Sequence, residues 1–210
     1  MMRRWIHAPM LALLALLLGA GVPAAAQQLG PDPFFLVAQP GMDSPAFRET
    51  VILVTPHLGR GHFGLIVNRP TDFSIGESVR GGEEFAAAGD PLYFGGPVEQ
   101  NSRLYLYRGR RRPAHSTPIM ERLHFGSLDR GDLGMLDVDG HRRNLRVFGG
   151  YAGWGPRQLS AEIGRGDWYV RPAKVDMIFD VPPKQLWRSL LGGPGKSVQA
   201  PLRSGAPASG

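Results

Sequence analysis

The chain has 210 residues, with no cysteine, 29 glycines, 19 prolines and a formal net charge of +6 at pH 7. This length fits one domain, or at most one and a half, and 42% hydrophobic residues are too many for a chain that is disordered throughout. The absence of cysteine excludes disulfides, zinc–thiolate sites, iron–sulfur clusters and thiol nucleophiles.

The N-terminal segment has the pattern of an export signal. Arg3 and Arg4 precede an uncharged, leucine-rich run over residues 8–22, and three alanines at 24–26 supply the small residues that a signal peptidase requires. The apolar run is shorter than the roughly 20 residues of a membrane-spanning helix. We therefore expect residues 1–26 to be a cleaved signal peptide and the mature protein to be periplasmic or secreted. The alternative is that this segment stays uncleaved and anchors the protein. We expect contact with a membrane only through such an anchor.

The other end has the composition of a tail. Residues 192–210 are rich in Gly, Pro, Ser and Ala and offer almost nothing to bury, so we expect them to be disordered. Residues 29–191 then form the folded domain, which is long enough to bury about two-thirds of its unfolded surface.

Short apolar runs bounded by glycine and proline predict a series of strands. We expect these strands at residues 34–38, 51–54, 63–67, 92–94, 104–107, 124–125, 145–148 and 167–170. The short, glycine-rich stretch 56–61 makes residues 50–68 a β-hairpin. The run Val51 to Val54 is apolar on both faces, which is typical of a central strand.

Helices are predicted to be fewer. Pro156 begins one helix, Leu159 and Ile163 lie four residues apart in it, and Gly164 ends it. A second helix carries an apolar stripe at Leu186, Trp187, Leu190 and Leu191 and ends at Gly192. Shorter helices are expected near residues 128–136 and after Ser74. Two to four short helices beside mainly antiparallel strands predict an α+β fold.

Two glycine- or proline-flanked stretches present candidate ligand-binding residues. Asn68 and Arg69 follow the hairpin, where an amide and a guanidinium could together bind an anion or a carbonyl; the alternative is a turn that only ends the strand. Gly95 and Gly96 permit close approach of a ligand or of another backbone, and the alternative is a tight turn.

A third stretch surrounds two aromatic residues with glycines. Tyr151 and Trp154 are predicted to lie on a loop directly before a helix, with Gln158 in its first turn. Such a loop could form a stacking surface or a protein contact, and the helix N-terminus could bind an anion. The alternative is that the two aromatic side chains fill the core beneath the loop.

Catalysis finds weaker support in the sequence. A hydrolase could use His57 with Asp43 or Ser44, but no Gly-x-Ser-x-Gly elbow is present. His57, His62 and His124 have no spacing that defines a metal site. We therefore expect no metal or cofactor and keep the hydrolase as an alternative.

Several motifs occur in an order and spacing that together are specific. They lie at residues 35–38, 42–47, 50–53, 57, 64–70, 95–98, 150–154, 158–159, 162–163, 168, 178–179 and 186–187. In this the chain resembles the YqgE/AlgH family of bacterial proteins over about residues 34–191. The resemblance implies a compact α+β domain whose sheets curl toward a barrel-like body, and it implies no established reaction.

The chain also departs from that family's pattern. Family members usually look cytoplasmic and are often described as transcriptional regulators, whereas this chain begins with an apparent export signal. The histidine of the hairpin loop usually follows a glutamate, and here it follows Pro56. Export would separate the protein from DNA, so the departure weighs against the regulator description.

The expectation for function is a non-enzymatic binding module in the cell envelope. Its ligand would be an anionic small molecule or a peptide or protein partner. Nucleic acid is a weaker alternative: the arginines at 108–112 and 142–143 could contact phosphates, but no helix-turn-helix or basic helix accompanies them. The candidate binding residues are Asn68, Arg69, Gly95, Gly96, Tyr151, Trp154 and Gln158.

Overall fold

The structure is a computed structural model that describes residues 29–56, 58, 61–79, 90–128 and 142–192. The expected signal peptide, the tail after Gly192, the catalytic candidate His57 and nearly all of the helix expected at 128–136 lie outside these residues. Among the described residues, no helix has the length and apolar character needed to cross a membrane.

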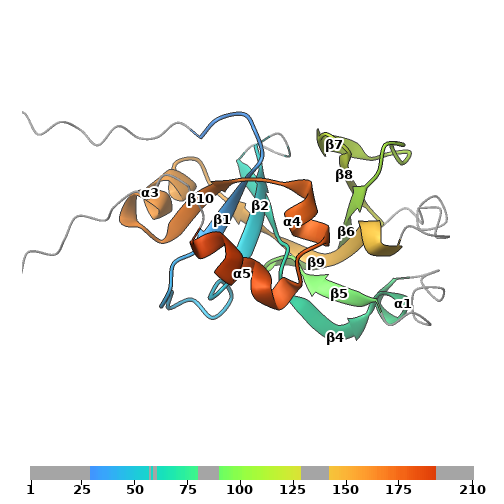
Figure 1. Ribbon diagram of the computed structural model, residues 1–210, viewed down its shortest axis with the longest axis horizontal. Coiled ribbons are helices and arrows are strands. Elements are labelled where there is room, and N and C mark those ends of the chain that lie inside the picture. The colour runs from blue at the N-terminus through green and yellow to red at the C-terminus, as the bar shows by residue number, and fades with distance from the viewer. Residues whose placement is uncertain (1–28, 57, 59–60, 80–89, 129–141, 193–210) are drawn as a thin grey trace, which may run out of the picture.

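The described strands join into one ten-stranded sheet that curls into a half-barrel (Figure 1). Its order is β10-β1-β2-β3-β9-β6-β8-β7, and β5 connects β4 to β9. All described pairs are antiparallel except β5 with β9, so the expected mainly antiparallel α+β fold is confirmed. The strands are β1 (Phe34–Ala38), β2 (Val51–Thr55), β3 (His62–Ile66), β4 (Pro70–Ser74), β5 (Pro91–Phe94), β6 (Val98–Arg108), β7 (Thr117–Met120), β8 (Leu123–Ser127), β9 (Leu145–Trp154) and β10 (Trp168–Pro172).

The central strands are buried on both faces, as their unbroken apolar runs predict. One core lies between the sheet and helices α4 (Val175–Phe179) and α5 (Pro183–Leu191), which cross the strands in Figure 1. A second core packs against α3 (Gln158–Arg165), and a third lies among β5, β6 and β9 around Leu92, Tyr105 and Val147. Alternate side chains of β1 and β2 enter the first two cores: Phe35, Val37, Val51 and Leu53 the first, and Phe34, Leu36, Ile52 and Val54 the second.

The helices follow local sequence signals with one correction. Helix α5 ends at Gly192 as expected, and its Trp187 indole donates a hydrogen bond to the carbonyl of Ala38 (2.8 Å), which ties the helix to β1. Helix α3 continues past Gly164 and ends at Gly166, whose φ of 86° gives the left-handed cap. The short helix α1 (Ile75–Ser78) follows Ser74 as expected.

A second correction concerns residues 149–154, expected as a loop. They form the second half of β9, because β3 pairs with this stretch: His62 lies opposite Trp154, and Gly64 lies opposite Ala152. At its start, the Gly95 N–H donates to the Gly149 carbonyl (2.9 Å). Strands β4 and β7 were not expected, because each contains a proline, Pro70 or Pro118, and proline argues against a strand. The short helix α4 was not expected either.

Candidate functional site

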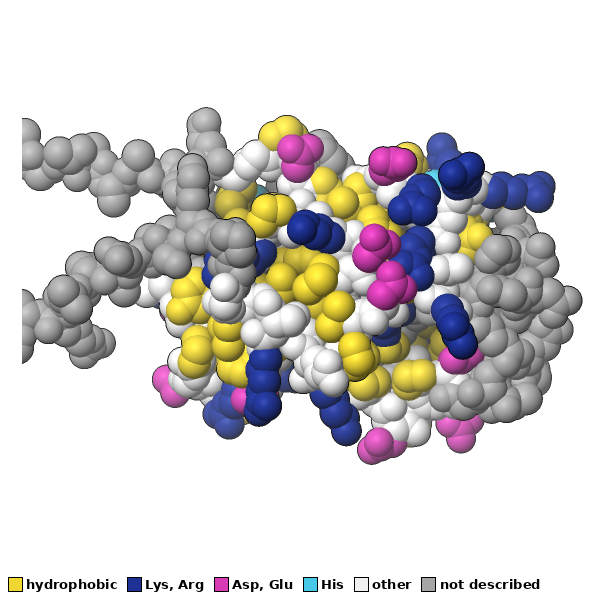
Figure 2. All heavy atoms as spheres, in the orientation of Figure 1, with side chains coloured by type: hydrophobic (Ala, Val, Ile, Leu, Met, Phe, Trp, Pro, Cys, Tyr) yellow, Lys and Arg dark blue, Asp and Glu magenta, His cyan; other side chains and the backbone are white. Residues whose placement is uncertain are grey.

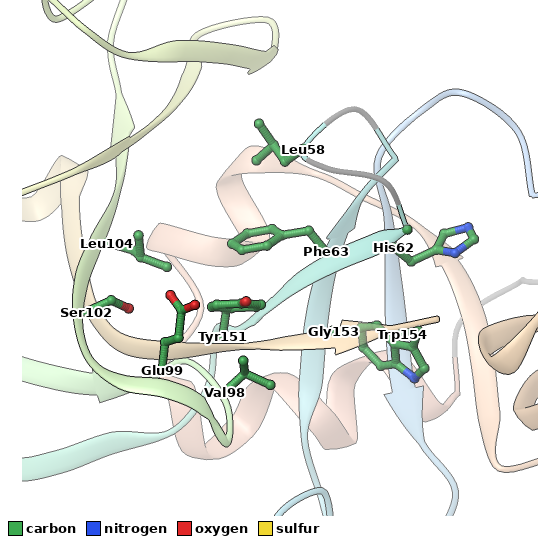
Figure 3. A pocket seen from close by; sticks show the side chains of 11 residues that line it. Leu58, His62, Phe63, Val98, Glu99, Ser102, Leu104, Tyr151, Gly153 and Trp154 are labelled. Carbon is green, nitrogen blue, oxygen red and sulfur yellow. The ribbon is translucent and has the colours of Figure 1, made fainter. Parts of the chain in front are cut away.

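A hollow of about 480 Å³ opens between β3, β6 and the end of β9 (Figure 3). Figure 3 shows His62 and Trp154 at one end of it and Ser102 and Leu104 at the other. Leu58 of the hairpin loop lines it as well. Hydrophobic and aromatic side chains therefore supply most of its wall.

Aromatic rings from neighbouring strands form the centre of the hollow. The rings of Phe63 and Tyr151 stack with centroids 4.9 Å apart, and Phe125 meets Phe63 edge-on at 5.3 Å. The antiparallel pairing of β3 with β9 brings Phe63 opposite Gly153, so a residue without a side chain stands beside the ring. Tyr151 is half-buried and exposes part of its ring to the hollow.

Glu99 supplies a carboxylate beside these aromatic rings. It lies where the β6–β9 register shifts between Val98 and Arg103, and its φ of 47° is left-handed, which costs a non-glycine residue about 1 kcal/mol. Figure 3 shows its carboxylate beside the Tyr151 ring, on the side toward Ser102. Strain of this kind is often retained where a side chain must be presented in one direction.

Two further polar atoms of the lining are buried and have no hydrogen-bond partner among the described residues. They are Oγ of Ser102 and Nδ1 of His62. Buried polar groups usually have partners, so each atom offers a point where a ligand or a water could bind.

The side chains of Asn68 and Arg69 form hydrogen bonds to backbone groups outside the hollow. The Asn68 side chain accepts from the Val51 N–H (2.8 Å) and donates to the Glu49 carbonyl (2.9 Å). The Arg69 guanidinium donates to the carbonyls of Ala46 (2.6 Å) and Arg48 (2.7 Å). Burial lowers the pKa of Arg69 from its ordinary value, while Glu49 partly offsets this effect. Both side chains therefore fasten the segment before β2 to the end of the hairpin.

Gly95 and Gly96 are buried against the backbone of β9. A Cβ on Gly95 would overlap the Gly150 carbonyl oxygen, and one on Gly96 would overlap the backbone of Tyr151. Of the sequence-based alternatives for this stretch, the structure shows close approach of another backbone.

Trp154 and Gln158 meet at Glu162 of α3. The Trp154 indole donates to Oε2 of Glu162 (2.8 Å) and the Gln158 amide donates to Oε1 (3.0 Å). Trp168 donates to Oε2 as well (2.9 Å). Trp154 is buried in the core beneath α3, and it reaches the hollow only at one edge.

Comparison with known proteins identifies the family. The AlgH-like family model matches residues 35–199. The chain belongs to the AlgH-like family. It is 33% identical over 166 residues to a UPF0301 protein of Chlorobium luteolum, covering 78% of this chain and 86% of the relative. It is 36% identical over 167 residues to a UPF0301 protein of Myxococcus xanthus, covering 78% and 90%.

Two solved structures share the fold. The solution structure of the AlgH protein from Pseudomonas aeruginosa superposes with a TM-score of 0.62 at 26% identity and covers 80% of this chain and 93% of that one. A crystal structure of a Corynebacterium diphtheriae protein gives a TM-score of 0.58, also at 26% identity. The resemblance drawn from the ordered motifs is thereby confirmed, and the family's function is not established.

In this AlgH-like chain, the seven predicted binding residues do not gather at one place. Tyr151 and Trp154 line the hollow. Gly95 and Gly96 lie behind it in the sheet, while Asn68, Arg69 and Gln158 serve the contacts described above. Whether any of them binds a ligand stays a prediction.

Sequence reasoning missed Phe63, Glu99 and Ser102 of this AlgH-like hollow. Phe63 was assigned to a strand by its apolar neighbours, and nothing local shows which strand it faces. The register shift that presents Glu99 depends on pairing with a strand about 50 residues later. The polar stretch after Pro97 was the one available signal, because polar residues inside a strand region indicate irregular backbone.

The residues considered for hydrolysis lie apart from the hollow. Asp43 is exposed and Ser44 half-buried, and both line a separate depression beside Trp168. His57 lies outside the described residues, so this alternative stays a hypothesis. Among the described residues, no group of three or more His, Asp or Glu side chains could hold a metal ion.

Proposed function

We propose that this AlgH-like chain is an exported, non-enzymatic binding module whose hollow accepts side chains of a peptide or protein partner. The observation that carries the proposal is the Phe63–Tyr151 stack with the Glu99 carboxylate beside it. A stack of this kind offers a wide apolar surface, and the carboxylate beside it gives direction.

The size and lining of the hollow suit one or two side chains. A volume of about 480 Å³ lies within the usual range for small-ligand sites. Half-exposed Tyr and Phe side chains, together with Leu58 and Val98, form the kind of surface on which binding energy concentrates in protein interfaces. The exposed edge of Val98, one of two large hydrophobic residues exposed among those described, adds apolar area at its rim.

The charge of the lining favours a basic side chain in the partner. Among the described residues of the lining, Glu99 and His62 are the ionisable acidic or basic side chains. An ammonium or guanidinium group could pair with this carboxylate and lie over the Tyr151 ring, where the π-face attracts cations. For this hollow we therefore propose a peptide with neighbouring apolar and basic side chains, which is the second of the two ligand classes, an anionic small molecule or a peptide or protein, that the sequence left open.

The binding proposal is tested with a displayed library of random peptides selected against the full-length protein. Selected peptides should carry Lys or Arg beside an apolar residue. Tyr151→Leu should cost about 2 kcal/mol of binding free energy, as for an interface residue of central importance. Tyr169→Leu, which alters a half-buried tyrosine on β10, is the matched control. Equal losses in both variants, or selected peptides that are acidic, would contradict the proposal.

Export is proposed from residues 1–26 alone, by their charged, apolar and small-residue order. The test is cell fractionation followed by the intact mass of the protein, which should correspond to a chain that begins at Gln27. Unprocessed protein in the cytoplasm, retained on DNA in a salt-dependent manner, would instead favour the transcriptional-regulator alternative.

A further inference from the structure

Arg146 is a buried cation that the proposed binding hollow does not use. It lies near the start of β9, at the other end of the strand from Tyr151, and is only 8% exposed. Its guanidinium lies 4.6 Å from the ring centroid of Tyr93 and 5.7 Å from that of Phe179. Its Nε has no hydrogen-bond partner among the described residues. A buried guanidinium donor without a partner is costly and calls for an explanation.

A second cavity gives this cation access to a ligand. It has a volume of about 630 Å³ and lies between β5, the start of β9 and α4. Arg146, Arg143 and Asn144 line one side of it, and Tyr93, Phe179 and Asp180 also contribute. The cavity is therefore large enough for a small organic molecule and holds several hydrogen-bond donors.

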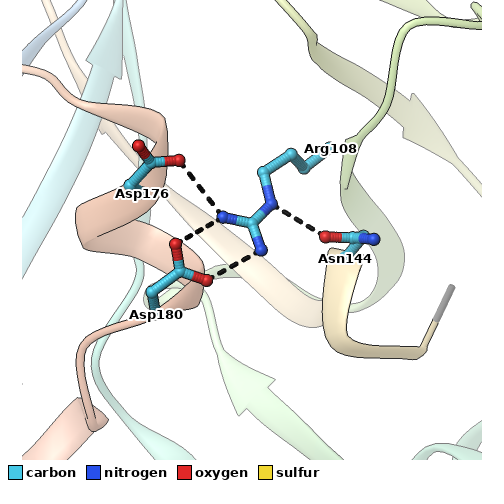
Figure 4. Close-up of polar contacts among 4 residues, drawn as sticks. All are labelled: Arg108, Asn144, Asp176 and Asp180. Atoms are coloured by element: carbon cyan, nitrogen blue, oxygen red, sulfur yellow. Dashed lines mark hydrogen bonds and ion pairs between the residues drawn. The ribbon is translucent and has the colours of Figure 1, made fainter.

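The neighbouring acidic side chains are engaged by another arginine. Arg108 donates from Nη1 to Oδ2 of Asp180 (2.7 Å) and from Nη2 to Oδ1 (2.7 Å), a bidentate pair, and from Nη1 to Asp176 (3.2 Å) (Figure 4). Its Nε donates to Oδ1 of Asn144 (2.8 Å), which turns the Asn144 amide group toward other acceptors. Figure 2 shows acidic and basic side chains side by side over this part of the surface.

The remaining cations of the cavity then favour an anion. Among the described residues, Arg108 is paired with Asp176 and Asp180, whereas no ion pair engages Arg143 or Arg146. Burial lowers the pKa of Arg146 to about 10, and Asp180 offsets part of this effect. The group is thus still protonated at neutral pH, with its charge only partly compensated.

We propose that Arg146 is the anchor of a second binding site, which takes the phosphoryl group of a small phosphorylated sugar. The planar guanidinium donates from two nitrogens in a geometry that matches phosphoryl oxygens. Arg143, exposed at the rim, adds a second cation, and the Asn144 amide adds a neutral donor. The sugar occupies the rest of the cavity, which Ile75, Pro91 and Leu145 also line.

The test uses the full-length protein with two probes, inorganic phosphate and glucose 6-phosphate, against chloride and glucose at matched ionic strength. Both probes raise the unfolding temperature of the wild-type protein and give a saturable titration by calorimetry, with glucose 6-phosphate the tighter. Arg146→Gln lowers the affinity for glucose 6-phosphate at least about tenfold, which is the loss expected when a charge-assisted hydrogen bond is removed. Arg188→Gln, at an exposed position on α5, is the control and leaves the affinity unchanged.

A second variant keeps the proposal testable if Arg146→Gln does not fold. Arg143→Gln changes an exposed side chain of the same cavity. It lowers the affinity for glucose 6-phosphate about threefold, as expected when a partly screened charge is removed. In the folded wild-type protein, nuclear magnetic resonance of the Arg146 Nε–H group shifts on addition of either probe. The proposal is overturned if the wild-type protein binds neither probe, or if Arg143→Gln and Arg188→Gln bind alike.

Discussion

Glu162 accepts hydrogen bonds from three side chains and so fixes the end of β9 to α3. The indoles of Trp154 and Trp168 both donate to Oε2, at 2.8 and 2.9 Å, and Gln158 donates to Oε1 at 3.0 Å. Trp154 also forms one end of the hollow, which means that this carboxylate holds part of the proposed binding surface in place.

Replacing Glu162 should destabilise the fold. Glu162→Gln puts an amide donor where one oxygen now accepts, so we expect a loss of about 1–3 kcal/mol of unfolding free energy. Urea denaturation followed by tryptophan fluorescence measures it. Glu121→Gln, at an exposed glutamate between β7 and β8, controls for the loss of a surface charge. Equal stabilities of the two variants would show that the Glu162 contacts are not important.

The left-handed backbone conformation of Glu99 is predicted to lower the stability of the fold while it directs the carboxylate into the hollow. Glycine adopts a φ of 47° without the steric cost that glutamate bears, so Glu99→Gly should raise the unfolding free energy by about 0.5–1 kcal/mol. The same variant should lose the basic-residue preference in peptide selection. Thermal unfolding measures the first effect, and a lower melting temperature for Glu99→Gly would argue against strain at this position.

At the scale of elements, Gly95 shows what local sequence can and cannot predict. The strand positions were predicted from short apolar runs, and the hairpin of β2 and β3 from its glycine-rich loop. Partners distant in the chain could not be predicted, because they depend on contacts such as that of Gly95 with Gly150, more than 50 residues away. Residues 149–154 were predicted to be a loop because their glycines leave no alternation of apolar and polar residues, which is the local signal of a strand.

Adding a methyl group at Gly95 should disrupt the joining of β5 to β9. The new Cβ would overlap the Gly150 carbonyl, so Gly95→Ala should cost about 2–3 kcal/mol of stability. Gly164→Ala is the matched control, because no atom lies within 4 Å of its added Cβ and α3 continues through it. That control should gain up to about 1 kcal/mol from helix propensity. Chemical denaturation measures the unfolding free energy of both variants. A Gly95→Ala protein as stable as the wild type would contradict the packing of Gly95 against β9.

The link between β6 and α4 should weaken in acid. Hydrogen bonds from Arg108 hold the pKa of Asp180 below its ordinary value of 3.8 in the folded protein. The unfolded chain therefore binds the proton more readily, and the stabilisation is present above that ordinary value and is lost as pH falls through the lower folded pKa. The Asp180 carboxylate is exposed to solvent, which screens the interaction, so its contribution is about 1 kcal/mol or less.

The measurement compares urea midpoints of the wild type and Asp180→Asn from pH 7 down to pH 2. The wild type should be the more stable at neutral pH, and the difference should vanish at the acidic end. Asp72→Asn, on exposed β4, serves as the control for removing a surface carboxylate. A stability difference for Asp180→Asn that persists unchanged to pH 2 would show that the ion pair is not its cause.

At the scale of the whole molecule, β9 joins the two sites. Its first residues carry Arg146 into the anion cavity, and its last residues carry Tyr151 and Trp154 into the aromatic hollow. The ordered motifs predicted the fold, which the AlgH relatives confirm. They could not predict either cavity, since each is lined by strands whose pairing is set by the curl of the half-barrel. Tyr151 was selected from sequence for its glycine neighbours, whereas Arg146 lies in an apolar strand and gave no signal.

Binding of a peptide in the hollow is best tested by hydrogen exchange with mass spectrometry on the full-length protein, with and without a selected peptide. We expect slower exchange in the segments 61–63, 98–104 and 151–154, which contribute residues to the hollow, and no change at residues 168–172 of β10. Protection confined to other segments, or the same protection pattern in Tyr151→Leu as in the wild type, would contradict it.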